Sequence, residues 1–226
     1  MSRIILEYIF KKTNNYTLKR LPLNCTSNFD MTKINQFKRS ASFLYEIGTM
    51  RKLARAHRQT LLTNDLSDNI SSHSYRVTWI GYLLAKMENV DPYKVILMCL
   101  SHDISEARSG DQNWLNKRYV KVFEDEIDND QVDGMPEELS EVLKEYKERK
   151  SKESIVAKDA DLLDQMLLLK EYIHQGNKEA VSWLGDGKKN KHYQLLKTKS
   201  AIKLAHEIVR QTPSDWWKGV WTEKRR

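Results

Sequence analysis

Apolar residues recur at intervals of three and four along most of the chain, and this period is typical of amphipathic α-helices. The first such segment follows Asp30, with Asp30 or Thr32 as its cap. Its apolar positions are Ile34, Phe37, Ala41, Leu44 and Tyr45. Helical sequence continues through Met50, Leu53 and Ala54, and a polar loop is expected at 63–69.

Two further helices are predicted in the middle of the chain. Ser71 or Ser72 can cap the first of them. Its broad apolar face comprises Val77, Ile80, Leu83, Leu84 and Met87. Asp91 and Pro92 mark the start of the second, because a capping aspartate and a proline at the first helical position favour helix initiation. This helix is nearly all apolar as far as Leu100, so we expect it to be buried.

Helical patterns continue towards the C-terminus. We expect a turn at 107–110, a helical stretch near 114–123, a charged helix from Pro136 to about Lys150, an amphipathic helix at 155–173 and a long last helix at 193–210. The acidic run at 124–133 is expected to be a solvated loop, with a second metal site as the alternative. Clear period-two strands are absent outside the first 30 residues, so the predicted fold class is all-α.

The pattern divides the chain into three parts. Residues 1–30 predict a short hairpin or a loose extension, residues 31–212 a helical core, and residues 213–226 a basic tail rich in tryptophan. The total of 226 residues is enough for one sizeable hydrophobic core. Trp216, Trp217 and Trp221 are expected to pack the tail or a contact between subunits.

Charge and cysteine content change this picture little. Lys and Arg number 38 against 31 Asp and Glu, and the net charge of +7 favours anionic partners such as nucleotides, although a lysine-rich surface gives the same balance. Cys25 and Cys99 have no motif spacing, which excludes a disulfide scaffold and fits a cytoplasmic location. We find no membrane span and no dedicated nucleic-acid-binding motif, so neither partner is expected.

The candidate chemistry begins with His102 and Asp103, at the end of the apolar helix. Imidazole and carboxylate are standard ligands of divalent metals, and both groups need partners there because unpaired burial is costly. A capping or hydrogen-bonded pair is the alternative interpretation. His73 lies in the first turn of the preceding helix. Antiparallel packing would bring the start of that helix near the end of the next, so the three residues are expected to meet.

Asp161 is the fourth candidate ligand. It lies beside Leu162 and Leu163 in the amphipathic helix, where a carboxylate without a cation is costly. Asp159 and Asp164 are alternatives by composition, and Asp164 shares a helix face with Asp161.

The order His73, His102-Asp103, Asp161 resembles the H…HD…D signature of HD-domain phosphohydrolases. Three segments resemble the 5′-deoxynucleotidase-like branch of that family. They are Ser72-His73-Ser74, then His102-Asp103-Ile104-Ser105-Glu106 with Gly110-Asp111, and Lys158-Asp159-Ala160-Asp161. The resemblance covers residues 37–173 and implies a helical HD-domain bundle. It also implies that His73, His102, Asp103 and Asp161 bind one divalent metal ion, for which Mn, Co, Fe, Ni, Zn and Mg are candidates.

The resemblance further implies catalytic roles for Glu106 and Asp111, which match the acidic residues that follow the HD pair in the branch. Glu106 lies one turn past His102 if the helix continues, and could position water or protonate the leaving oxygen. Asp111 could act in the same way or orient a ligand.

Three residues are candidates for binding the substrate. Arg58 stands where the bacterial 5′-deoxynucleotidase has a substrate-contacting arginine, and Lys158 could add a positive charge near Asp161. The branch carries a tryptophan after the arginine that helps to exclude a ribose 2′-hydroxyl, whereas this chain has Gln59. Arg76 is interpreted as a structural ion-pair residue. The remaining histidines are expected at the surface or in the core: His57, His174, His192 and His206.

The sequence thus predicts a metal-dependent phosphohydrolase that removes phosphate from nucleoside 5′-monophosphates, with deoxyribonucleotides as the first expectation. The alternatives are a nucleoside triphosphate hydrolase on the same scaffold, a nuclease of the HD type and a metal-free interaction protein. The resemblance alone implies a homodimer.

Overall fold

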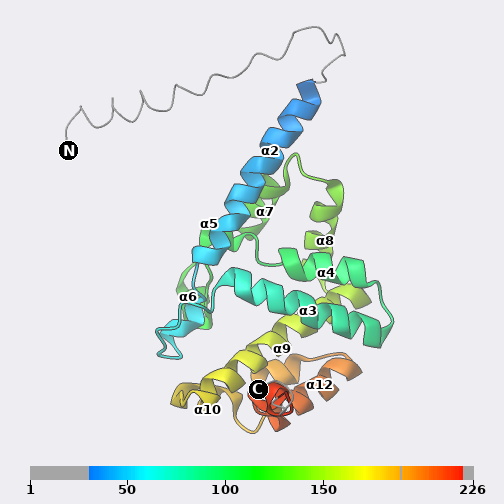
Figure 1. The fold of residues 1–226 in the computed structure, drawn as a ribbon. Coiled ribbons are helices and arrows are strands. Elements are labelled where there is room, and N and C mark those ends of the chain that lie inside the picture. The colour runs from blue at the N-terminus through cyan, green and yellow to red at the C-terminus, as the bar shows by residue number, and fades with distance from the viewer. Residues whose placement is uncertain (1–30, 189, 221–226) are drawn as a thin grey trace, which may run out of the picture. The chain divides into compact units, whose positions relative to one another are not determined.

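The computed structural model describes residues 31–188 and 190–220. The expected hairpin or extension at 1–30, Cys25 and Trp221 lie outside the described residues. Figure 1 shows the elements, which are α2 (Met31–Ile47), η1 (Gly48–Lys52), η2 (Ala56–Gln59), α3 (Ile70–Glu88), α4 (Pro92–Ser101), α5 (Glu106–Ser109), α6 (Trp114–Tyr119), α7 (Glu124–Val132), α8 (Glu137–Glu148), α9 (Lys152–His174), α10 (Lys178–Leu184), α11 (Lys191–Leu195), α12 (Lys199–Arg210) and α13 (Asp215–Lys218).

The predicted all-α class is confirmed. Within the described ranges, β-pairing is limited to one isolated bridge between Ala54 and Asn69. None of the helices in those ranges combines the length and the apolar composition that crossing a membrane requires.

The core forms where α3, α4 and α9 pack together (Figure 1). The link of three residues between α3 and α4 makes them antiparallel neighbours, and Asn89 ends α3 in the left-handed region at a φ of 56°. Fully buried side chains of the three helices fill the space between them: Val77, Leu84, Val95, Met98, Leu163 and Leu169.

Polar caps fix where α3 and α4 begin. Asn69, rather than Ser71 or Ser72, caps α3: its side chain accepts from the Ser72 amide at 3.0 Å, and the Ser72 hydroxyl accepts from the Asn69 amide at 3.1 Å. The predicted start of α4 is confirmed, since the Asp91 carboxylate accepts from the Tyr93 amide at 2.9 Å.

The acidic run was wrongly predicted to be a loop, because residues 124–132 form α7. Three acidic residues in its first turn favour the positive end of the helix dipole. Lys147 of α8 then pairs with Asp125 at 2.7 Å and with Asp128 at 2.6 Å, which offsets the repulsion within the run.

The predicted last helix at 193–210 is also wrong, because the chain breaks between α11 and α12. The cause is Asp159 of α9, a buried carboxylate that accepts from the amides of Lys197 at 3.0 Å and Thr198 at 2.7 Å. These amides would otherwise donate within a continuous helix. The Thr198 side chain in turn caps α12.

The apolar face expected on the first helix is not buried. Phe37 is 76% exposed and Tyr45 is 82% exposed, whereas Phe43 on another face of α2 packs with Met50 and Ile70. On α3, Leu83 and Met87 are exposed although they were expected on the buried face. The 3.6-residue period therefore located these helices but misjudged which apolar positions are covered.

A close approach of backbones holds the three central helices together at Gly81 of α3. A Cβ atom at this position would lie 2.5 Å from Cys99 Sγ of α4, 3.1 Å from Val95 Cγ1 and 3.7 Å from Ala160 Cβ of α9. Only glycine fits this crossing without displacing a neighbour.

Gly81→Ala should lower the free energy of unfolding by about 1–3 kcal/mol through overpacking, although alanine is the better helix former. Urea unfolding of the purified protein measures this change. Gly48→Ala is the matched control: a Cβ there meets nothing within 4 Å, so stability should change by less than about 0.5 kcal/mol. Cys99→Ala should rescue part of the loss in the double variant, and an unaltered stability of Gly81→Ala would contradict the described crossing.

Candidate metal centre

Four side chains from the three central helices converge on one point. His73 is the fourth residue of α3, His102 and Asp103 follow α4, and Asp161 lies in α9. The Nε2 atoms of the two histidines are 3.3 Å apart. Asp103 Oδ2 is 3.4 Å from His73 Nε2 and 3.2 Å from His102 Nε2, and Asp161 Oδ1 is 3.4 Å from His73 Nε2 and 3.9 Å from His102 Nε2.

Hydrogen bonds behind the two imidazoles turn both Nε2 atoms towards this point. His73 Nδ1 donates to Asp164 Oδ2 at 2.7 Å, and His102 Nδ1 donates to the Cys99 carbonyl at 2.8 Å. Because each Nδ1 donates away from the cluster, Nε2 is the nitrogen that would bind a metal, and His73, whose pKa burial would lower but the surrounding carboxylates raise well above its usual range, would release its Nε2 proton on binding. The His102 ring also packs on Tyr146 of α8, with ring centroids 5.4 Å apart.

The spacing and charge of these groups fit a divalent cation, with His73, His102 and Asp103 as the tightest set and Asp161 somewhat farther, at 3.9 Å from His102 Nε2. Ligands about 2.1 Å from an ion lie about 3.0–3.4 Å from one another in tetrahedral or octahedral geometry. Ligand atoms of His73, His102 and Asp103 all lie within 4.8 Å of one another. Burial alone would raise the pKa of Asp103, but the two imidazoles hold that pKa well below its usual range. The ligand set therefore supplies negative charge to a cation.

The three aspartates that the sequence left as alternatives have separate contacts. Asp161 faces the two Nε2 atoms, Asp164 lies behind His73, and Asp159 holds the chain before α12. Burial opposes ionisation of Asp161, yet Lys158 and the imidazoles hold its pKa well below the usual range. Lys158 Nζ lies 2.6 Å from Asp161 Oδ2.

Arg76 is confirmed as a structural ion-pair residue. Its Nε donates to Asp164 Oδ1 at 2.5 Å and its Nη1 donates to Glu171 Oε1 at 2.6 Å. Asp164 thus joins Arg76 to His73, which balances the charge of a carboxylate buried behind the imidazole.

Arg55 is the residue at the site that sequence reasoning missed. Its Nη1 lies 3.7 Å from Asp103 Oδ2 and its Nε lies 3.4 Å from Asp111 Oδ2, but both nitrogens are buried and lack a hydrogen-bond partner. Asp111 Oδ2 also accepts from the Ala56 amide at 2.6 Å, which fixes the loop that carries Arg55. An arginine flanked by two alanines was the available signal, since such a segment is suited to burial.

Arg58 and Gln59 do not join the metal-binding cluster. They line a neighbouring depression of about 660 Å³ to which Arg55, Leu62 and Asn64 also contribute. Gln59 is exposed, and its Oε1 accepts from Asn113 Nδ2 at 3.2 Å. Arg55 thus belongs both to the lining of this depression and to the surroundings of Asp103.

Glu106 follows the metal ligands on the first turn of α5. Burial raises the pKa of its carboxyl to about 9, and the carboxylates of Asp103 and Asp111 add to the rise. Its Oε2 atom is buried and has no hydrogen-bond partner. In the absence of a cation, Glu106 therefore holds a proton at neutral pH beside the point where the ligands converge.

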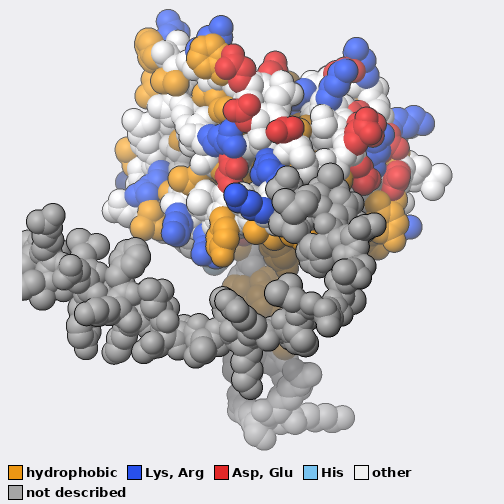
Figure 2. Space-filling model, turned by 90° about the horizontal axis from the view of Figure 1, so that it is seen from above, with side chains coloured by type: hydrophobic (Ala, Val, Ile, Leu, Met, Phe, Trp, Pro, Cys, Tyr) orange, Lys and Arg blue, Asp and Glu red, His pale blue; other side chains and the backbone are white. Residues whose placement is uncertain are grey.

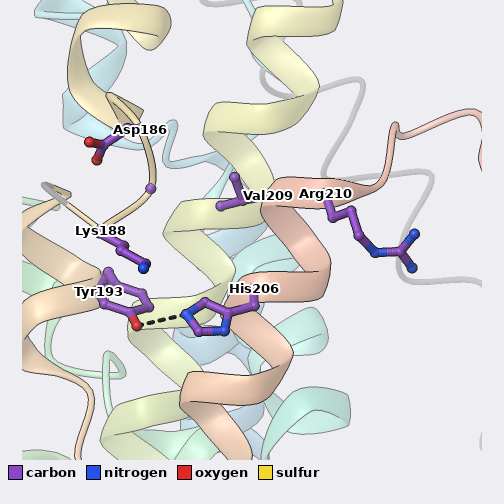
Figure 3. Close-up of a pocket in the computed structure, with 7 residues that line it drawn as sticks. Asp186, Lys188, Tyr193, His206, Val209 and Arg210 are labelled. Atoms are coloured by element: carbon purple, nitrogen blue, oxygen red, sulfur yellow. Dashed lines mark hydrogen bonds between the residues drawn. The ribbon is translucent and has the colours of Figure 1, made fainter.

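The other histidines have different surroundings. His57 lies buried against Asp68 at 2.7 Å. Figure 3 shows Tyr193 of α11 pointing to His206 of α12, where the hydroxyl and Nε2 are 2.8 Å apart, beside a separate pocket of about 310 Å³. His192 is half-buried, burial lowers its pKa, and the charges acting on it include Asp161, Lys158 and Arg55. The sequence prediction that these histidines are ordinary surface or core residues therefore missed that His192 lies near the metal centre.

Comparison with known proteins identifies the family to which this fold belongs. The HD domain family matches residues 50–203. The 5′-deoxynucleotidase HDDC2 of Dictyostelium discoideum is 28% identical over 153 residues, which cover 59% of this chain and 80% of the relative. The 5′-deoxynucleotidase YfbR of Shigella boydii is 29% identical over 147 residues, which cover 58% of this chain and 73% of the relative.

Solved structures share the fold. A predicted metal-dependent phosphohydrolase from Magnetospirillum magnetotacticum has a TM-score of 0.60 and 24% identity, with 77% of this chain and 94% of that chain covered. A conserved hypothetical protein from Pyrococcus furiosus has a TM-score of 0.59 and 23% identity, with coverage of 75% and 98%.

Because the family match spans more than half of its residues, this chain belongs to the HD-domain family. Within that family it is a phosphohydrolase, as the resemblance in sequence predicted, and is therefore an enzyme. The convergence of His73, His102, Asp103 and Asp161 is consistent with this class, while their individual roles as ligands stay predictions.

Asp164→Asn should weaken metal binding about 10- to 100-fold, because the neutral amide no longer holds the His73 proton on Nδ1 with a full charge. Titration calorimetry with Mn²⁺ on metal-stripped protein measures the affinity. Glu171→Gln is the matched control, since it removes only the outer partner of Arg76 and should leave affinity within about twofold. Equal affinities in the two variants would contradict a role for Asp164 in orienting His73.

Glu106→Gln should stabilise the metal-free protein at pH 8 by about 1–3 kcal/mol. The folded state binds the Glu106 proton more tightly than the unfolded state does. The stability that Glu106 contributes is therefore fully present below the ordinary glutamate pKa of 4.5 and is lost as the pH rises towards 9. The glutamine variant avoids this loss, and the difference should vanish as the pH falls to 4.5. Unfolding of both proteins in EDTA across this pH range measures it, and a pH-independent difference would argue against a buried neutral Glu106.

Proposed function

We propose that this enzyme hydrolyses nucleoside 5′-monophosphates to the nucleoside and phosphate, with deoxyribonucleotides as the expected substrates. The observation that supports this most directly is Arg55, whose buried guanidinium has two nitrogens without hydrogen-bond partners beside the ligand cluster. A phosphate next to this guanidinium could accept a charge-assisted hydrogen bond from it. Lys158, whose Nζ lies 2.6 Å from Asp161 Oδ2, places a second positive charge beside the ligand cluster.

His73, His102, Asp103 and Asp161 would hold the divalent ion. When bound, such an ion provides a water-derived nucleophile at neutral pH and neutralises charge on the phosphoryl group. The protein's own side chains orient the phosphate and protonate the leaving oxygen. Arg55 aligns the phosphate, and Glu106, whose burial raises the pKa of its carboxyl in the metal-free protein, is the acid that donates a proton to the leaving 5′ oxygen as the ester bond breaks. Asp111 positions Arg55 through the loop at Ala56.

The depression beside Arg55 is a suitable place for the nucleoside. Its volume of about 660 Å³ is within the range of small-molecule sites, and its lining offers Arg58, Gln59 and Asn64 as polar contacts. A substrate with its phosphate at Arg55 would extend its sugar and base into this space. Gln59 replaces the tryptophan of related deoxynucleotidases, so the preference between deoxyribose and ribose depends on a different side chain here.

The charge around the site favours one phosphate over three. Arg76, which could have supplied a further cation for a triphosphate, is committed to Asp164 and Glu171. On the part of the face in Figure 2 that the described residues form, lysine and arginine side chains are interspersed with acidic ones, an arrangement that does not favour a nucleic acid. A homodimer and a cytoplasmic location stay predictions.

The proposal predicts metal-dependent release of phosphate from deoxynucleoside monophosphates. Metal-stripped protein is assayed with deoxy- and ribonucleoside mono- and triphosphates after addition of Mn, Co, Mg or Zn. The double variant His102→Ala/Asp103→Ala should be inactive, because it removes two ligands. Arg55→Lys should lose about tenfold or more in kcat/KM while Arg58→Lys loses less, because only Arg55 borders the ligand cluster.

Product analysis separates the alternatives. Release of pyrophosphate or triphosphate from triphosphates would replace the proposal with a triphosphate hydrolase, and cleavage of DNA or RNA alone would replace it with a nuclease. No turnover of any nucleotide with any of the four metals would refute it. The ratio of deoxy- to ribonucleotide turnover measures the sugar preference with Gln59 in place.

A further inference from the structure

Leu62 combines two uncommon features in the turn that follows η2. Its backbone φ is +51°, in the left-handed region, which bulky side chains disfavour and glycine or asparagine adopt easily. Its side chain is also 78% exposed to solvent, although it is large and apolar. Neither feature contributes to packing of the core, so folding alone gives no reason for leucine here.

The surrounding turn is firmly held, so Leu62 is fixed in this conformation. The Leu61 amide donates to the His57 carbonyl at 2.8 Å, and the Thr63 amide donates to the Arg58 carbonyl at 3.1 Å. Asn177, at the start of α10, donates to the Leu61 carbonyl at 2.7 Å, and the Leu61 side chain is completely buried. With Leu61 turned inward and its backbone bonded on both sides, the next side chain is directed out of the core.

The outward side chain lies in the lining of the depression beside Arg55. Of the eight residues that line it, Leu62 alone has a large apolar side chain, whereas Arg58, Gln59 and Asn64 are polar. A small-molecule site typically pairs an apolar surface with a few polar groups that fix orientation. A strained residue that is exposed and borders such a site points to a functional role for the strain.

We propose that Leu62 forms the apolar surface on which the nucleobase of the substrate packs. The inference rests on the proposed function, since it takes the nucleotide to be bound with its phosphate at Arg55. A base presents a flat, weakly hydrated face, and covering it with a leucine side chain removes apolar surface of both from water. The polar side chains nearby are then left to contact the edge of the base and the sugar.

The test compares a nucleotide with the same phosphate lacking a base. Deoxynucleoside 5′-monophosphates and 2-deoxyribose 5-phosphate are hydrolysed by wild type, Leu62→Gly, Leu62→Asn and Leu62→Met, and thermal unfolding is followed for each. Glycine and asparagine suit a φ of +51°, so these variants should keep or raise the Tm. Leu66→Gly is the matched control, because Leu66 is an exposed leucine of the same loop that does not line the depression.

In Leu62→Gly and Leu62→Asn, the KM for the nucleotide should rise about five- to tenfold with kcat within about twofold, as expected for loss of an apolar contact made equally in substrate and transition state. The ratio of kcat/KM for nucleotide over deoxyribose phosphate should fall by the same factor. Leu62→Met and Leu66→Gly should keep the wild-type ratio.

An active wild type with the same ratio in Leu62→Gly would overturn this inference and leave the proposed function intact. A wild type that hydrolyses neither compound would overturn the proposed function and this inference with it. If the ratio of kcat/KM for nucleotide over deoxyribose phosphate falls equally in Leu66→Gly, the effect belongs to the loop as a whole. That result would also overturn the role of Leu62.

Discussion

The close crossing of α3, α4 and α9 at Gly81 is the constraint on which the metal centre depends. The atoms that meet there belong to residues that adjoin the ligands: Ala160 precedes Asp161, and the Cys99 carbonyl accepts the hydrogen bond from His102 Nδ1. The packing of the helices at this crossing therefore determines where the ligand atoms lie. A shift of the helices at this crossing would move the Nε2 atoms of the imidazoles relative to one another by a similar amount, and metal coordination tolerates only a few tenths of an ångström.

Signals confined to a few neighbouring residues predicted much of this structure. Asp91-Pro92 located the start of α4, and the amphipathic period located α9. The ordered motif at His73, His102-Asp103 and Asp161 predicted the convergence of three helices, because its side chains belong to helix ends and faces that the antiparallel packing of α3 and α4 brings together. Composition could not separate Asp161 from Asp164, since both lie on one face of α9 and differ only in which side of His73 they contact.

The wrong predictions share a physical cause: in each case the local structure depends on residues that are distant in the sequence. Asp159 ends the helix before α12 from 38 residues away, and Lys147 stabilises the acidic α7 from 22 residues away. Arg55 has no periodic or motif signal, because its position at the site depends on a loop bonded to Asp111. The exposed apolar side chains of α2 and α3 likewise have a helical period, but the period does not say which face another element covers.

Within six positions of α9, three aspartates point in three directions: Asp159 to the chain before α12, Asp161 to the imidazole Nε2 atoms and Asp164 to the far side of His73. Inserting or deleting one residue in this stretch would rotate everything beyond it by about 100° around the helix axis. No single shift of register preserves all three contacts. This segment can therefore change by substitution during evolution but not in length, and true relatives should align across it without gaps even where the rest of the sequence has diverged.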